Sequence, residues 1–121
     1  MEKVESFEDL WIWKEARDLV RGIYTDFGEG TPAYRDYGFK AQIQKAGISI
    51  MNNIAEGFER TTDADKARFF DIAKGSSGEV RSMYYPAADL GYLSAELAHD
   101  RREKARKISK GIATLTARFR Q

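Results

Sequence analysis

The chain lacks the residues on which several kinds of functional site depend. It contains no cysteine and a single histidine, His99. The absence of cysteine excludes disulfides, thiolate zinc sites and cysteine nucleophiles. A di-iron bundle needs two Glu-x-x-His pairs, and only Glu96 precedes a histidine at that spacing, so a di-iron site is excluded too. We therefore predict that the protein has no metal site and no cofactor.

Short motifs of common enzyme classes are also missing. The sequence contains no Walker glycine pattern, no G-x-G-x-x-G and no G-x-S-x-G nucleophile elbow. With no cysteine and one histidine, a nucleophilic triad has no support. We predict that the protein is not an enzyme.

Long apolar runs are absent as well. No segment approaches the roughly 20 apolar residues of a membrane span, and the first ten residues, MEKVESFEDL, lack the layout of a signal peptide. We expect a cytoplasmic protein without membrane contact. The 121 residues are predicted to form a single domain, 1–121, that is large enough to bury a core.

Apolar residues instead recur at steps of three and four along most of the chain, which is the spacing of one helical face. Glycine and proline in Gly28–Pro32, the polar segment Thr61–Asp65 and Gly91 separate four such stretches. The pattern predicts an all-α fold, an up-down-up-down antiparallel four-helix bundle. Its helices are expected near residues 8–27, 37–60, 64–90 and 94–120.

The third stretch has an unusual centre, Gly75-Ser76-Ser77-Gly78. Each glycine there costs about 1 kcal/mol relative to alanine in a helix interior. The expected compensation is close packing against the small Ala46-Gly47 of the second helix. The predicted core line of the third helix steps by fours and threes through Phe69, Ala73, Ser76, Val80, Met83, Ala87 and Leu90.

Polar residues gather near the end of the second helix, where packing does not predict them. A structural polar cluster is expected there, with Glu79 of the third helix facing Glu56; its members are Asn52, Asn53, Glu56, Arg60 and Glu79. A buried Asn53 needs partners for its amide and can fix helix register. Two facing carboxylates can serve acid–base chemistry or a metal, but a Glu–Arg network is the more typical role.

Charge is distributed unevenly along the chain. Residues 101–121 have a net charge of +7, with one acid, Glu103, whereas the first hundred residues have a net charge of −6. Such a segment marks either a solubilising face or a contact surface for polyanions. The candidate nucleic-acid-binding residues are Arg101, Arg102, Lys104, Arg106, Lys107, Lys110, Arg118 and Arg120. Within them, Arg102, Arg106 and Lys110 form a stripe with almost no acidic counterweight in its own helix.

Aromatic residues exceed what one small core requires. They suit either base stacking or a subunit interface, and the interface is favoured for most of them. These residues are Trp11, Trp13, Tyr24, Phe27, Tyr34, Tyr37, Tyr84, Tyr85 and Tyr92.

Four stretches give the chain a family resemblance. They are FEDLWIWKEARDLVRGIY (7–24), YGFKAQIQKAGISIMNNIAEGFER (37–60), ARFFDIAKGSSGEVRS (67–82) and ADLGYL (88–93). The pairing of IAEG with the later GSSGE is specific. On these residues the chain resembles the bacterial four-helix-bundle proteins encoded in 23S ribosomal RNA intervening sequences. Met51 departs from the family pattern, which often has proline there.

The resemblance implies a compact bundle that assembles into a ring of five, and distant kinship with the basic pentameric accessory protein of diversity-generating retroelements. It implies no established activity. Two functions therefore remain open: weakly sequence-specific RNA or other nucleic-acid binding through the basic fourth helix, and a ring-shaped scaffold that holds an acidic or enzymatic protein partner.

Overall fold

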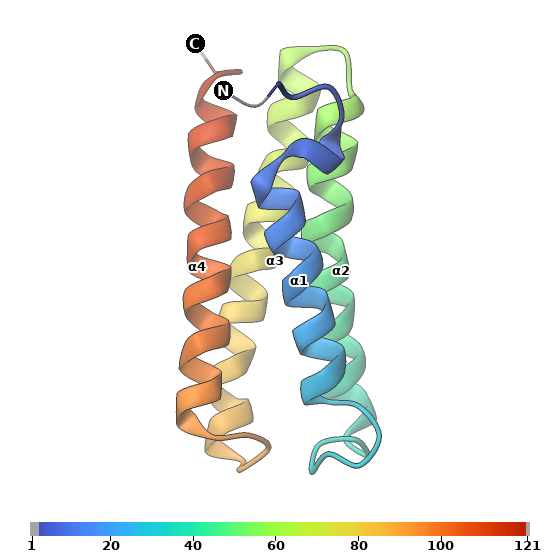
Figure 1. The fold of residues 1–121 in the computed structure, drawn as a ribbon, viewed down its shortest axis with the longest axis vertical. Coiled ribbons are helices and arrows are strands. Elements are labelled where there is room, and N and C mark those ends of the chain that lie inside the picture. Colours follow the sequence, from blue (N-terminus) through green and yellow to red (C-terminus); the bar gives the residue numbers. More distant parts are fainter. Residues whose placement is uncertain (1–2, 121) are drawn as a thin grey trace.

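The chain forms a bundle of four long helices. The computed structural model describes residues 3–120, and these contain no strand. The helices are α1 (Trp11–Asp26), α2 (Tyr37–Glu59), α3 (Asp63–Asp89) and α4 (Ala95–Ala117). Consecutive helices run in opposite directions (Figure 1). This confirms the predicted all-α antiparallel four-helix bundle. No helix in the described range is both long and apolar enough to cross a membrane.

The first helix begins later than the sequence predicted. Residues Phe7–Asp9 form a separate 3₁₀ turn, η1, and α1 begins at Trp11 after extended backbone at Leu10. The Asp9 carboxylate accepts hydrogen bonds from the backbone N–H of Glu5 and of Ser6, at 2.9 and 3.2 Å. The capping contacts of Ser6 and Asp9 therefore belong to this turn and not to α1.

The other helix ends follow their capping residues. Thr62 caps α3 by accepting from the N–H of Asp65, and Ser94 caps α4 by accepting from the N–H of Leu97. Helix α3 ends in a Schellman motif, in which Tyr92 donates to the carbonyl of Ala87 and Gly91 adopts a φ of +75°. These boundaries lie within a few residues of the predicted ones.

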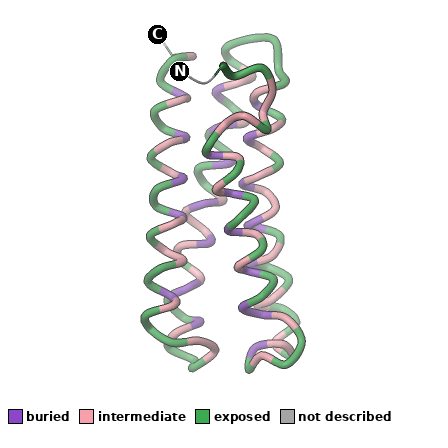
Figure 2. The backbone as a smooth tube through the Cα atoms, viewed as in Figure 1, coloured by how far each residue is buried: buried purple, intermediate pink, exposed green. Residues whose placement is uncertain are grey.

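Buried residues line the inner face of every helix (Figure 2). At alternate positions, however, the core of α3 lies one residue along from the predicted line. Phe70, Ser77 and Tyr84 are buried, whereas Phe69, Ser76 and Met83 are only partly buried and Leu90 is 60% exposed. Ala73, Val80 and Ala87 belong to the core as predicted.

The small residues of α2 and α3 do not all serve the contact that was predicted. Gly47 faces α1, since a Cβ there would lie 2.6 Å from Cδ1 of Ile23. Gly75 and Gly78 face open space, with nothing within 4 Å of an added Cβ. The expectation that these two glycines allow close packing against α2 is therefore wrong. The serines between them make the contacts, Ser76 to α2 and Ser77 to α4.

Candidate nucleic-acid interface

Helix α1 places a row of carboxylates against one flank of α4. Lys104 Nζ lies 2.7 Å from Glu15 Oε2 and 2.6 Å from Asp18 Oδ2, and Lys107 Nζ lies 3.5 Å from Glu15 Oε1. Hydrogen bonds from Lys104 lower the pKa of Glu15 and of Asp18, although partial burial acts in the opposite direction. This flank of α4 is therefore largely neutralised.

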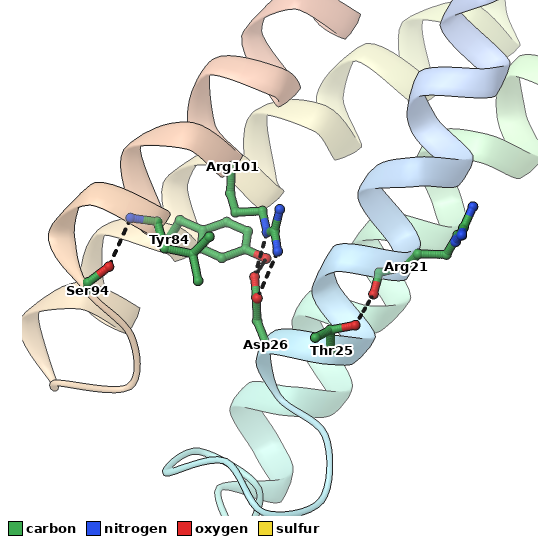
Figure 3. Close-up of polar contacts among 7 residues, drawn as sticks. Arg21, Thr25, Asp26, Tyr84, Ser94 and Arg101 are labelled. Atoms are coloured by element: carbon green, nitrogen blue, oxygen red, sulfur yellow. Dashed lines mark hydrogen bonds and ion pairs between the residues drawn. The ribbon is translucent and has the colours of Figure 1, made fainter.

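The row ends in a buried network that joins three helices (Figure 3). Asp26 of α1 is 7% exposed. Its Oδ2 accepts from Arg101 Nε at 2.7 Å and from the Tyr84 hydroxyl at 2.8 Å, while Oδ1 accepts from Arg101 Nη2 at 3.0 Å. Gly22 makes room for this guanidinium, because a Cβ at residue 22 would lie 2.8 Å from Arg101 Cζ.

The contacts of this network raise the pKa values of both Tyr84 and Arg101. Burial, with a further contribution from the Asp26 carboxylate, raises the pKa of the Tyr84 phenol far above its ordinary value. Tyr84 therefore stays neutral and donates to Asp26. The hydrogen bond to Asp26 also raises the pKa of Arg101, which remains charged. We conclude that Arg101, a candidate for nucleic-acid contact, instead forms part of the network that links α1, α3 and α4.

The other flank of α4 keeps its charge. Arg102, Arg106 and Lys110 lie four residues apart on one row, which crosses the outer face of α4 and continues through Thr114 to Arg118 on the α1 side. Arg106 lies 3.6 Å from Glu103 of its own helix, and the other three have no carboxylate partner among residues 3–120. The Arg102 guanidinium lies over the ring of Tyr85, 4.1 Å from its centroid.

Helix α3 adds cations to the same side of the bundle. Lys74 and Arg81 share a helical ridge with Tyr85, at steps of seven and four. Neither forms an ion pair with a described residue. Because Tyr85 contacts Arg102, this ridge lies along the α4 side of α3. The α3–α4 flank therefore carries more cations than acids; its ion-paired acids are Glu103, beside Arg106, and Asp71, which pairs with Arg120.

The eight candidate residues thus separate into two groups. Five form ion pairs: Arg101, Lys104, Arg106, Lys107 and Arg120, the last with Asp71 of α3. Three have no described carboxylate partner: Arg102, Lys110 and Arg118. The stripe of Arg102, Arg106 and Lys110 has one ion-paired acid among the described residues, Glu103, while α1 and α3 supply the acids that pair with Arg101, Lys104, Lys107 and Arg120.

The predicted polar cluster does not form as one unit. Glu79 accepts a hydrogen bond from Gln42. Glu56 is exposed and lies 3.6 Å from Arg60. The Arg60 guanidinium covers the ring of Phe69. Glu56 and Glu79 therefore do not face each other, since antiparallel packing sets Glu56 against the beginning of α3. Asn52 is exposed.

The contacts around the two serines of α3 replace that cluster. Asn53 is partly buried and donates to the carbonyl and the hydroxyl of Ser49, at 2.8 and 3.0 Å. Ser49 in turn contacts Ser76 across the α2–α3 seam at 2.8 Å, and Ser77 donates to the Ala105 carbonyl of α4 at 2.7 Å. The described residues contain no group of three or more metal-ligating side chains.

The surplus aromatic residues differ in how far they are buried. Phe27 and Tyr84 are buried in the core, and Trp13, Tyr34 and Tyr92 are partly buried. The exposed ones are Trp11, Tyr24, Tyr37 and Tyr85. Sequence reasoning missed Asp26, the central residue of the buried network. Its spacing from Glu15, Asp18 and Gly22 on one helical face was the signal available.

Fold and surface together define an antiparallel four-helix-bundle protein with one neutralised and one basic flank on its last helix. The chain matches the model of the 23S rRNA-intervening sequence protein family over residues 8–114, and it belongs to that family. A crystal structure from Bacteroides thetaiotaomicron VPI-5482, of a protein with unknown function from the S23 ribosomal protein family, has the same fold. The TM-score is 0.81 at 17% identity, covering 88% of this chain and 96% of that one. No curated protein matches the chain.

Proposed function

We propose that this is a non-enzymatic, cytoplasmic, oligomeric protein that binds RNA through the α3–α4 flank. The observation that carries the proposal is the segregation of charge on α4. The acids of α1 neutralise Lys104, Lys107 and Arg101, whereas the row of Arg102, Arg106, Lys110 and Arg118 retains its charge. A protein of net charge +1 therefore presents one strongly basic face.

Binding through this face is expected to be driven by phosphates and weakly sequence-specific, because Arg and Lys in a row carry no pattern that reads base edges. If the four cations of the row each contact a phosphate, the logarithm of the affinity falls with the logarithm of salt concentration at a slope of about −3 for a single strand. The family's association with ribosomal RNA favours RNA over DNA.

A charge-reversal experiment with a matched control tests the proposal. Arg102, Arg106 and Lys110 are replaced together by Glu, and binding of a structured RNA is titrated at 50 and 200 mM salt. We expect loss of binding with an unchanged circular dichroism spectrum, since the apolar face of Ile108 and Ile112 is untouched.

The control reverses the same number of charges elsewhere. Lys14, Arg17 and Arg21 are exposed on the outer face of α1 and form no ion pair with a described residue. Their triple replacement by Glu should retain most of the binding at 200 mM salt. Equal loss in both variants, or no binding by the unmodified protein at low salt, contradicts the proposal.

A second candidate function is a ring-shaped scaffold for a protein partner, and a specific observation favours self-association. Gly75 and Gly78 of α3 face open space at a cost of about 1 kcal/mol each relative to alanine. Ile72 and Leu90 on the same helix are exposed. A second copy that packs closely on this face would account for them. The oligomer proposed is a cyclic pentamer with a heterologous contact. Sedimentation equilibrium at micromolar concentration tests this, and a monomer refutes it.

A further inference from the structure

A groove lies at the end of the basic row, between the start of α1 and the end of α4. Its volume is about 330 Å³, which is within the range of small-ligand sites. Most of its lining is apolar, but Arg118 also lines it. The remaining lining residues are Val4, Asp9, Leu10, Trp11, Ile12, Gly111, Thr114 and Leu115.

Trp11 gives this groove an aromatic wall. Trp11, the first residue of α1, is 48% exposed. Gly111 makes room for the indole, because a Cβ at residue 111 would lie 2.5 Å from Cζ2 of Trp11. Lys107 Nζ lies 5.7 Å from the ring centroid. The indole is therefore held against α4 on one edge while much of its surface stays accessible.

The groove continues the basic row of α4. Residues four apart on an α-helix drift by about 40° per step around its axis, so the row crosses the outer face of α4 diagonally. It begins beside Tyr85 of α3, under Arg102, and reaches the Trp11 groove at Arg118. Along the axis the two ends are about 24 Å apart. Thr114, the remaining member of the row, also lines the groove.

We propose that Trp11 stacks on an unpaired base while Arg118 contacts an adjacent phosphate, so that the ligand of the basic face is single-stranded RNA. This inference rests on the proposed function. An exposed aromatic ring beside cations is the arrangement by which proteins hold unpaired bases without reading their sequence. A duplex keeps its bases stacked internally and cannot offer one to the groove. Arg118, with no carboxylate partner among residues 3–120, favours an anionic ligand over an apolar protein segment.

The test uses Trp11 as its own reporter. In a Trp13→Phe background Trp11 is the only tryptophan. Titration with a uridine decamer should quench its fluorescence, whereas a ten-base-pair RNA duplex should bind more weakly and leave the fluorescence nearly unchanged. Absence of quenching by a decamer that does bind overturns the proposal.

Substitutions separate stacking from charge. Trp11→Leu should weaken decamer binding about tenfold with an unchanged salt slope, and Trp11→Phe should retain most of the affinity. Arg118→Gln should make the salt slope shallower by about 0.7. Tyr37→Leu is the control, because it removes an aromatic ring from the start of α2 that is 64% exposed, more than Trp11, and should change neither quantity.

The outcomes distinguish a failure of the stacking inference from a failure of the proposed function. If the unmodified protein binds RNA but Trp11→Leu binds the decamer within twofold of it, the stacking inference is wrong and the proposed function stands. If Trp11→Leu instead changes the oligomeric state in sedimentation at unchanged affinity per chain, the indole contacts a second copy and the inference is again wrong. If the unmodified protein binds neither RNA, both proposals fail.

Discussion

Removal of the Asp26 carboxylate is the sharpest single test of what holds the bundle together. Asp26→Ala leaves the buried Tyr84 hydroxyl without an acceptor, which costs about 1–3 kcal/mol. It also leaves the Arg101 guanidinium without its counter-charge, and breaking a buried pair in this way costs about 3–5 kcal/mol. The Arg101 side chain is 24% exposed, so water partly replaces the lost carboxylate. We expect a total loss of about 3 kcal/mol.

Urea unfolding at one fixed protein concentration, followed by circular dichroism, measures this loss. For a domain of this size it corresponds to a decrease in melting temperature of about 10–15 °C. Asp18→Ala is the matched control, since that carboxylate also pairs with α4 but is 57% exposed; its removal should cost less than about 1 kcal/mol.

A double-mutant cycle checks the reasoning independently of the total. Tyr84→Phe alone should cost about 1 kcal/mol, because Asp26 keeps Arg101 as a partner. In the Asp26→Ala background the same change should instead recover about 1–3 kcal/mol, since it removes a buried hydroxyl that has lost its acceptor. The reasoning is refuted if Asp26→Ala loses less than 1 kcal/mol, or if Tyr84→Phe has the same effect in both backgrounds.

Three further predictions follow from the surface of the bundle. Gly75→Ala combined with Gly78→Ala should stabilise an isolated chain by about 1–2 kcal/mol, because both positions are helical and open, but should weaken any self-association through that face in sedimentation equilibrium. Glu56→Ala should change the free energy of unfolding by less than about 1 kcal/mol, since its pair with Arg60 is exposed, whereas Asn53→Ala should cost about 1 kcal/mol. The lowered pKa values of Glu15 and Asp18 mean that their contribution to stability is present above the ordinary carboxyl pKa and is lost as pH falls below it. Stability should therefore decrease from pH 5 to pH 3, and less steeply in Lys104→Met; equal slopes contradict this.

The helices and their ends were predictable because local chemistry determines them. Thr62, Ser94 and Gly91 act within a few residues of themselves, as a hydroxyl acceptor or a positive-φ residue does in any helix. The core line of α3 was not predictable in the same way. Phe69 and Phe70 are both aromatic, and Ser76 and Ser77 are identical. Periodicity alone does not decide which of two neighbouring lines faces the centre when both flanks of the helix contact other helices.

Whether a basic residue of α4 is neutralised depends on the acids of a different helix. For this reason the composition of α4 does not predict the charge of its surface. Glu15, Asp18 and Asp26 lie on one flank of α1, and antiparallel packing sets them against one flank of α4. Carboxylates that contact a cation neutralise it, whereas exposed charges more than about 10 Å apart are largely screened from each other. The acids of α1 therefore have little effect on Arg102, Arg106 and Lys110, which lie away from α1. A net charge of +1 is therefore compatible with a strongly basic face. In a bundle, the surface potential that a polyanion meets depends on which helix faces carry the acids, and not on how many acids there are.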